Sequence, residues 1–138
     1  MPMLRMEKYC ENVKNDAYGG SIELVEDGIT AIENELEARK PDDVMGEVEG
    51  YVDSILEVTS PILPLINMLN KCMIFMESYR EEGVKPDVLR EKFITFLETV
   101  REEQRQCVDK IGKIGSRMID EGNKVSTFST SGSVMEIL

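Results

Sequence analysis

The groups best suited to chemistry lie near the C-terminal end of the chain, at residues 126–133. This stretch carries six hydroxyl groups and a glycine, and an amphipathic helix is predicted directly after it. Free backbone N–H groups and the helix dipole favour an anion at such a position. Ser129, Ser131, Gly132 and Ser133 are therefore candidate phosphate-binding residues, although helix capping is the more frequent role of serines placed in this way.

No nucleotide-binding or catalytic motif accompanies this loop. The chain has neither Gly-x-x-x-x-Gly-Lys nor Gly-x-Gly-x-x-Gly, so the loop does not indicate a particular nucleotide. The chain also lacks histidine, which excludes Ser-His-Asp and Cys-His nucleophile pairs and His-ligated metals within it. Adjacent acidic residues such as Glu102-Glu103 are expected on solvated helix faces. These residues indicate no catalytic site, no metal site and no cofactor.

The three cysteines indicate a reducing compartment. Cys10, Cys72 and Cys107 are odd in number and far apart, and none belongs to a Cys-x-x-Cys pair. This usage is typical of intracellular proteins, so we predict a cytoplasmic location. Because free cysteine is among the most buried residue types, we predict that all three are buried.

A basic cluster surrounds the segment 112–115, which reads Gly-Lys-Ile-Gly. Gly-x-x-Gly holds the nucleic-acid backbone in KH domains. Here the motif falls inside a helical pattern and lacks the βααβ context of that fold. We interpret its two glycines as positions that allow close helix packing.

The composition is that of a folded, acidic, globular protein. Of the 138 residues, 41% are hydrophobic and 31% are charged, and the formal net charge is −11. Such a charge repels nucleic-acid phosphates and anionic lipids, so we expect no direct contact with nucleic acid or a membrane. No segment approaches the length of a membrane span. The acidic surface suits a basic protein partner.

Hydrophobic periodicity predicts five helices before residue 121. The first spans residues 3–17, and Gly19-Gly20 separate it from the second, whose predicted N-cap is Ser21. Pro41 separates the second helix from the third, with Asp42-Asp43 in the first turn of the third. Apolar residues three or four positions apart mark the buried faces of these two helices: Ile22, Val25, Ile29, Ile32 and Leu36, then Val44, Val48, Tyr51, Val52, Ile55 and Val58.

The fourth and fifth predicted helices differ from the others. Residues 65–75 follow Ser60-Pro61 and carry a single charge at Lys71, so we predict a helix buried on most sides at the centre of a bundle. Residues 85–120 form the longest predicted helix, roughly 50 Å long. We interpret it as a spine of the bundle or between domains, with a dimeric coiled coil as the alternative. Its predicted apolar face is Leu89, Phe93, Phe96, Val100, Cys107, Ile111, Ile114 and Met118, with Gln104 as the one polar interruption.

The pattern changes after Gly122. Residues 124–129 favour a short strand, residues 130–133 a polar loop and residues 134–138 a helix, which together make the first half of a βαβ unit. The predicted fold is mostly α: a helical domain at residues 1–121, whose long last helix leads into the first strand of a truncated Rossmann-like α/β domain at residues 122–138. Because a lone strand has unpaired edges, we expect a piece cut at a domain boundary, with strand pairing between subunits as the alternative.

Residues 119–138, which read IDEGNKVSTFSTSGSVMEIL, resemble the family of the α, β and δ regulatory subunits of translation initiation factor 2B. This family also holds methylthioribose-1-phosphate isomerase and ribose-1,5-bisphosphate isomerase. The resemblance implies a helical N-terminal domain that a long helix joins to a Rossmann-like C-terminal domain. The predicted order of elements agrees with it, including Gly19-Gly20 before the second helix and Ser60-Pro61 before the fourth.

Two departures from the isomerase pattern bear on function. The isomerases carry a catalytic Cys in a Thr-His-Cys-Asn-Ser loop, and Ser129 stands at that position here. They also carry Arg-Gly-Ala before the second helix, where the Arg helps to hold the substrate phosphate, and this chain has Tyr18-Gly19-Gly20 instead. By resemblance, Gly19 and Gly20 join the candidate phosphate-binding residues. A serine without a base does not replace a thiolate, and the family's catalytic Asp would lie beyond Leu138, so we expect no isomerase activity from this chain alone.

The resemblance implies a role in protein contacts. We expect a domain that binds initiation factor 2 or related subunits in a complex controlling guanine nucleotide exchange. The first alternative is a fragment of a sugar-phosphate isomerase with an altered site, whose full-length form binds a phosphorylated small molecule. The second is a helical scaffold that forms a homo-oligomer through its fifth helix.

Overall fold

The computed structural model describes residues 3–126 and 132–138, with the backbone alone at residues 132–133. Within these ranges the protein is mostly helical and contains no strand, so the mostly α prediction is confirmed. The helices are α1 (Met6–Lys14), α2 (Ser21–Arg39), α3 (Val44–Val58), α4 (Leu63–Ser78), α5 (Pro86–Ser116) and α6 (Gly132–Ile137).

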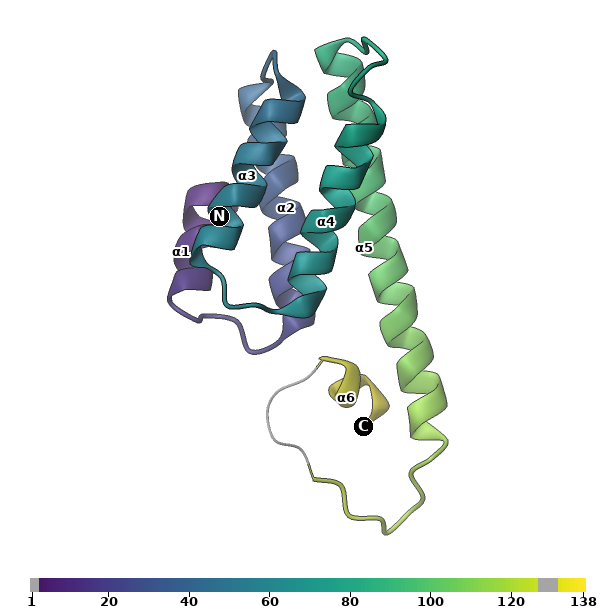
Figure 1. The fold of residues 1–138 in the computed structure, drawn as a ribbon. Coiled ribbons are helices and arrows are strands. Elements are labelled where there is room, and N and C mark those ends of the chain that lie inside the picture. Colours follow the sequence, from purple (N-terminus) through teal and green to yellow (C-terminus); the bar gives the residue numbers. More distant parts are fainter. Residues whose placement is uncertain (1–2, 127–131) are drawn as a thin grey trace.

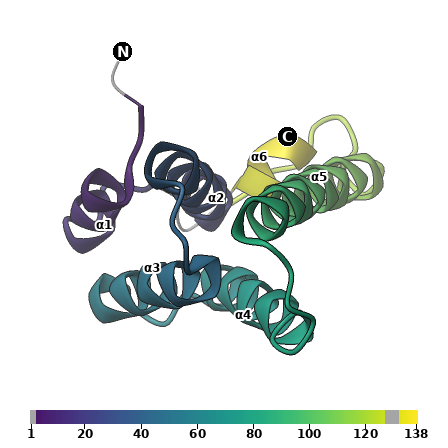
Figure 2. The ribbon, with the colours of Figure 1, turned by 90° about the horizontal axis from the view of Figure 1, so that it is seen from above.

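The helices of the bundle form two layers. Figure 2 shows α1, α2 and α5 side by side in one layer and α3 and α4 in the other. Because α2 contacts α1, α3, α4, α5 and α6, it is α2 rather than α4 that forms the centre. The prediction that residues 65–75 of α4 are buried on most sides is wrong, since Ile74 is 62% exposed and Lys71 is exposed as well. Asn67 and Asn70 supply part of the polarity of its exposed side, which a count of charges overlooks.

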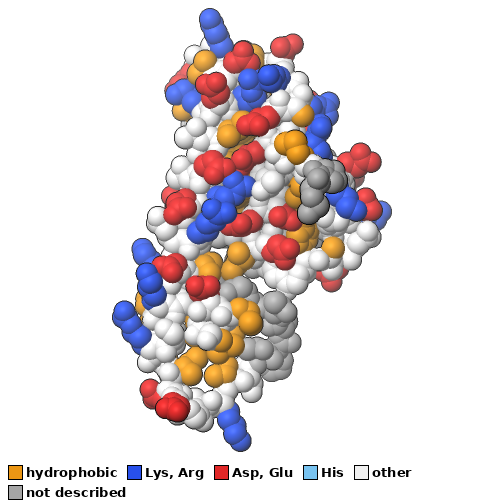
Figure 3. Space-filling model, turned by 180° about the vertical axis from the view of Figure 1, so that it is seen from behind, with side chains coloured by type: hydrophobic (Ala, Val, Ile, Leu, Met, Phe, Trp, Pro, Cys, Tyr) orange, Lys and Arg blue, Asp and Glu red, His pale blue; other side chains and the backbone are white. Residues whose placement is uncertain are grey.

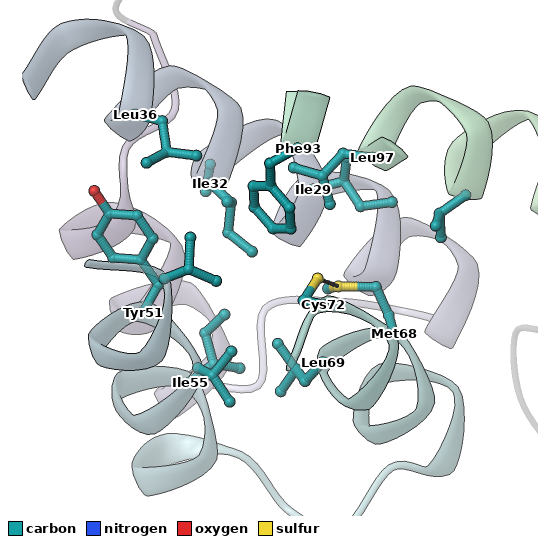
Figure 4. Packing of buried hydrophobic residues seen from close by; sticks show 14 of the residues in the cluster. Ile29, Ile32, Leu36, Tyr51, Ile55, Met68, Leu69, Cys72, Phe93 and Leu97 are labelled. Carbon is teal, nitrogen blue, oxygen red and sulfur yellow. Dashed lines mark hydrogen bonds between the residues drawn. The ribbon is translucent and has the colours of Figure 1, made fainter. Parts of the chain in front are cut away.

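The hydrophobic core fills the space between the two layers (Figure 4). Its central side chains come from α2, α4 and α5 and are at most 2% exposed: Ile29, Ile32, Leu69, Phe93 and Leu97. Each side chain of this size contributes about 1.5–3 kcal/mol when fully buried. The predicted apolar faces of α2 and α3 are confirmed, with Ile22 and Val58 half-buried at the ends of these faces.

Helix boundaries agree with the prediction at several places and differ at others. α5 begins at Pro86, where a proline fits the first turn because no N–H is needed there. α1 is shorter than residues 3–17, and Gly20 rather than Ser21 is the N-cap of α2. Asp43, predicted in the first turn of α3, instead caps that helix by accepting a hydrogen bond from the Gly46 N–H at 3.0 Å.

α5 extends well beyond the rest of the bundle (Figure 1). It has 31 residues, whereas α2, the longest of its neighbours, has 19. Its buried apolar residues end at Val100, and Leu97 is buried where the predicted pattern had placed Phe96. The chain then turns back, and α6 packs against both α5 and α2.

The segment between α5 and α6 does not form the predicted strand where it is described. Residues 124–126 are irregular, and residues 127–129 of the predicted strand lie outside the described residues. A strand needs a neighbour to pair with its backbone N–H and C=O groups, and the described residues supply none. The helix predicted at residues 134–138 is present as α6, two residues longer at its start.

Candidate functional site

The predicted phosphate-binding residues near the C-terminal end are only partly described. Ser129 and Ser131 lie outside the described residues. Gly132 and Ser133 form the first turn of α6, and their side chains are not described. Because α6 contacts α2, the fold brings this end of the chain against the helix that follows the two candidate glycines.

Gly19 and Gly20 line a cavity of about 570 Å³ between the end of α1, the start of α2 and the connection from α3 to α4. Lys14 supplies a cation to this cavity, Ser60 supplies a hydroxyl group, and Asp16 supplies an opposing negative charge. No side chain caps the first N–H groups of α2 among the described residues. A cation beside free helix N–H groups suits a phosphate, so this arrangement is compatible with the predicted role of the two glycines.

The far part of α5 carries an exposed apolar surface. Ile111, Ile114 and Met118 continue the predicted apolar face of the helix, but they are 43%, 62% and 79% exposed. Met135 and Leu138, in and after α6, are each 61% exposed. We call these five residues the distal face. Figure 3 shows hydrophobic side chains gathered over this part of the molecule.

Two glycines of α5 allow α6 to approach closely. A Cβ atom at Gly112 would lie 2.5 Å from Cγ of Glu136, and one at Gly115 would lie 2.5 Å from Cγ1 of Ile137. Distances this short between carbon atoms do not occur, so a larger residue at either position would displace α6. The prediction that these glycines serve close helix packing is confirmed.

Polar contacts hold α5 against α2 where the bundle ends. Gln104, the polar interruption of the apolar face, donates from Nε2 to the carbonyl oxygen of Ile22 at 3.2 Å. The next residue, Arg105, pairs at 3.0 Å with Glu26, which lies one turn after Ile22 in α2. The base of the projecting helix is therefore fixed by hydrogen bonds and an ion pair rather than by apolar burial.

Arg101 joins the same two helices through a more buried network. Its Nη1 donates to Glu33 Oε1 at 2.9 Å and to Glu98, and its Nη2 donates to Thr30 Oγ1 at 2.7 Å. Burial and the neighbouring Glu98 raise the pKa of Glu33 to about 7, and the hydrogen bond between the two carboxyl groups lowers the pKa of Glu98. One guanidinium thus pairs with two carboxyl groups whose pKa values are shifted in opposite directions.

The prediction that all three cysteines are buried is wrong. Cys72 is fully buried, and burial raises the pKa of its thiol to about 12, so it is unreactive at neutral pH. Cys10 is half-buried, and Cys107 is exposed because it lies where α5 leaves the bundle. Among the described residues, no group of three or more Cys, Asp or Glu is placed to hold a metal ion. None of the described helices combines the length and apolar character needed to cross a membrane.

Comparison with known proteins adds no assignment. No protein-family model matches the chain, and no curated protein matches it at a significant level. The resemblance of residues 119–138 to the initiation factor 2B family therefore stays a prediction.

The sequence predicted Ile111, Ile114 and Met118 of the distal face as part of an apolar helix face, but it did not predict their exposure, and it did not single out Met135 and Leu138. The length of α5 could have indicated this exposure, because α5 is 12 residues longer than α2, the longest of its neighbours. A helix that is this much longer than its neighbours cannot be covered by them over its whole length. The apolar face that continues along it must then be exposed or covered by something else.

Proposed function

We propose that this chain is a helical interaction domain of a protein related to the regulatory subunits of initiation factor 2B. In this proposal it is cytoplasmic and acts in a complex that controls guanine nucleotide exchange on initiation factor 2. The observation that carries the proposal is the distal face, an apolar surface on a helix that projects from its bundle. Contiguous apolar surface of this kind is typical of a region that another protein or domain covers.

The residues of the distal face have the spacing and size of an interaction surface. Ile111 and Ile114 are three positions apart and share one side of α5, and Met118 follows two residues after the helix ends at Ser116. Complete burial of one such side chain contributes about 1.5–3 kcal/mol, and a cluster of a few dominates many protein interfaces. The net charge of −11 would add attraction to a basic partner, which speeds association more than it tightens the complex.

Binding of initiation factor 2 to this chain, measured by calorimetry, tests the proposal. The test variant is Ile114→Asp, and its matched control is Ile74→Asp on α4, because both isoleucines are 62% exposed. We expect the unchanged chain and the Ile74→Asp variant to bind alike and the Ile114→Asp variant to bind at least about tenfold more weakly. Equal weakening by both variants, or no binding by the unchanged chain, would contradict the proposal.

A sugar-phosphate isomerase with an altered site is the second candidate function. The observation that favours it is the cavity beside Gly19 and Gly20, with its cation at Lys14. The full-length protein should then turn over ribose-1,5-bisphosphate or methylthioribose-1-phosphate, and Lys14→Met should weaken substrate binding. The absence of turnover with both substrates would remove this candidate.

A homo-oligomer formed through α5 is the remaining alternative. Sedimentation of the unchanged chain and the Ile114→Asp variant at high concentration distinguishes it. A dimer that dissociates in the variant would assign the distal face to a second copy of the chain. A monomer in both samples would exclude this alternative.

A further inference from the structure

A polar pocket of about 620 Å³ lies between α1, α2 and α3 and shares no residue with the distal face. Its volume is within the range of roughly 300–1,000 Å³ that is typical of small-molecule sites. The charged residues that line it are Arg5, Glu7, Glu35, Arg39 and Glu47. Tyr51 and two glycines of α3, Gly46 and Gly50, also line it.

Two of the charged residues are fully occupied with each other. Arg5 donates from Nε and Nη2 to the two carboxylate oxygens of Glu35, at 2.7 and 2.9 Å. The backbone N–H of Met6 adds a third hydrogen bond to Glu35 at 3.3 Å. These contacts hold the pKa of Glu35 below its usual range, with the Arg5 hydrogen bond as the largest cause. The pair forms a fixed wall of the pocket.

Arg39 and Glu47 are charged but make no hydrogen bond. Arg39 lies 3.7 Å from Glu35 Oε1 and 3.7 Å from Glu47 Oε2, which is too far for a hydrogen bond. Both contacts are ion pairs without a hydrogen bond. The pocket therefore presents an N–H donor group and a carboxylate acceptor next to each other, and both keep hydrogen-bonding capacity for a ligand.

Tyr51 adds a second donor that has no partner. Its side chain is nine-tenths buried, and its hydroxyl oxygen makes no hydrogen bond with any described residue. In Figure 4 the hydroxyl group points away from the labelled core side chains, such as Ile55. Burial and then Glu47 of the pocket raise the pKa of Tyr51, although the Glu47 carboxylate makes no hydrogen bond with the hydroxyl. A buried hydroxyl without a partner destabilises the folded protein, so a ligand that accepts a hydrogen bond from it would be bound favourably.

We propose that this pocket binds a free α-amino acid and prefers a basic one such as lysine. The ligand carboxylate accepts hydrogen bonds from Arg39 and from the Tyr51 hydroxyl, and the ligand ammonium group donates to Glu47. Arg5 and Glu35 cancel each other, so the charges left on the pocket are one arginine and the two carboxylates of Glu7 and Glu47. This remaining balance favours a ligand with a second positive charge over an acidic one.

The backbone of α3 leaves room for the ligand. A Cβ atom placed on Gly50 would meet no atom within 4 Å, so this side of the pocket is open. A leucine at this position would extend into the pocket without displacing a neighbour of the glycine itself. Gly50→Leu is therefore a variant that occupies the pocket and leaves the charged groups in place.

Thermal unfolding with millimolar L-lysine, L-leucine, L-glutamate or cadaverine at matched ionic strength tests the proposal. We expect lysine to raise the Tm of the unchanged chain most and leucine to raise it less. Glutamate and cadaverine should have no effect, because one brings excess negative charge and the other lacks a carboxylate. Calorimetry should show lysine binding weakened at least about tenfold in Tyr51→Phe and in Gly50→Leu. Tyr79→Phe, in a half-buried tyrosine at the end of α4, is the control and should bind normally.

Tyr51→Phe without ligand gives an independent check. Because the hydroxyl has no partner in the free protein, its removal should leave the Tm unchanged or raise it. A lower Tm would show that the hydroxyl is paired inside the protein, and this would overturn the proposal. Equal shifts with lysine and cadaverine, or the absence of any shift, would overturn it as well.

Discussion

Replacement of Glu33 by glutamine should stabilise the protein at alkaline pH and leave it unchanged at acidic pH. Glu33 lies between α2 and α5, with its side chain 16% exposed, and shares Arg101 with Glu98. Burial is the largest cause that raises its pKa from 4.5 to about 7. The folded state therefore binds this proton more tightly than the unfolded state does, and stability falls as the pH rises from about 4.5 to about 7.

The size of the stability change follows from the pKa shift of Glu33 and from the opposite pKa shift of Glu98. A shift of one pKa unit corresponds to about 1.4 kcal/mol, so the change at Glu33 sets an upper limit of about 3 kcal/mol. The lowered pKa of Glu98 offsets part of this, because it contributes stability at high pH. Glutamine keeps an oxygen that accepts from Arg101 and removes the charge. We expect Glu33→Gln to raise the free energy of unfolding by about 1–2 kcal/mol near pH 8 and to change it little near pH 4.

Urea unfolding followed by circular dichroism at these two pH values measures the effect. Glu26→Gln is the control, because Glu26 also pairs with an arginine of α5 but does so at the surface, where Arg105 is 58% exposed. The control should change stability by no more than about 0.5 kcal/mol. If Glu33→Gln is less stable than the unchanged protein near pH 8, Glu33 contributes as an ionised partner of Arg101 and the reasoning is wrong.

Two further predictions test packing. Gly28→Ala should destabilise the protein by about 1–3 kcal/mol in urea unfolding, because its Cβ would lie 2.8 Å from the hydroxyl oxygen of the buried Tyr9. Gly50→Ala should stabilise the protein by up to about 1 kcal/mol, because its Cβ would meet no atom within 4 Å and alanine favours a helix more than glycine does. An equal gain from both alanines would contradict the packing around Tyr9. A thiol reagent at neutral pH should modify the exposed Cys107 quickly and the buried Cys72 only on unfolding, and mass spectrometry of the labelled chain would show a different order if the core is open.

The sequence predicted the helices well wherever a proline or glycine interrupts the hydrophobic pattern. Pro86 marked the start of α5, and Gly19-Gly20 marked the break before α2. The apolar spacing also identified the buried faces of α2 and α3, because a helix that packs on one side must carry its apolar residues three and four positions apart. These features depend on local geometry, which a single sequence contains.

Features that depend on the arrangement of helices were not predicted. The low charge of α4 suggested a central helix, yet the number of neighbours of a helix is set by the packing of the whole bundle. The exposure of Cys107 and Ile114 depends on where the other helices end rather than on the pattern within α5. The pocket around Tyr51 unites residues of three helices, so no spacing along the chain could indicate it.

Among the candidate phosphate-binding residues, Gly19 and Gly20 were predicted only through the family resemblance, whereas residues 129–133 were predicted from their position before a helix. Gly19 and Gly20 line a cavity, but their contribution would come from backbone groups and open space rather than from side chains. The prediction that Ser129 stands where the isomerases carry their catalytic cysteine is not tested, because that residue lies outside the described residues.

Hydrogen exchange of the chain with and without initiation factor 2 tests the proposed function most directly. The distal face predicts added protection of backbone amides in the last third of α5, from Cys107 to Ser116, and in α6. Amides of α1 and of the first half of α5 should exchange at the same rate in both samples. Protection confined to the bundle, or identical exchange at saturating initiation factor 2, would contradict the account.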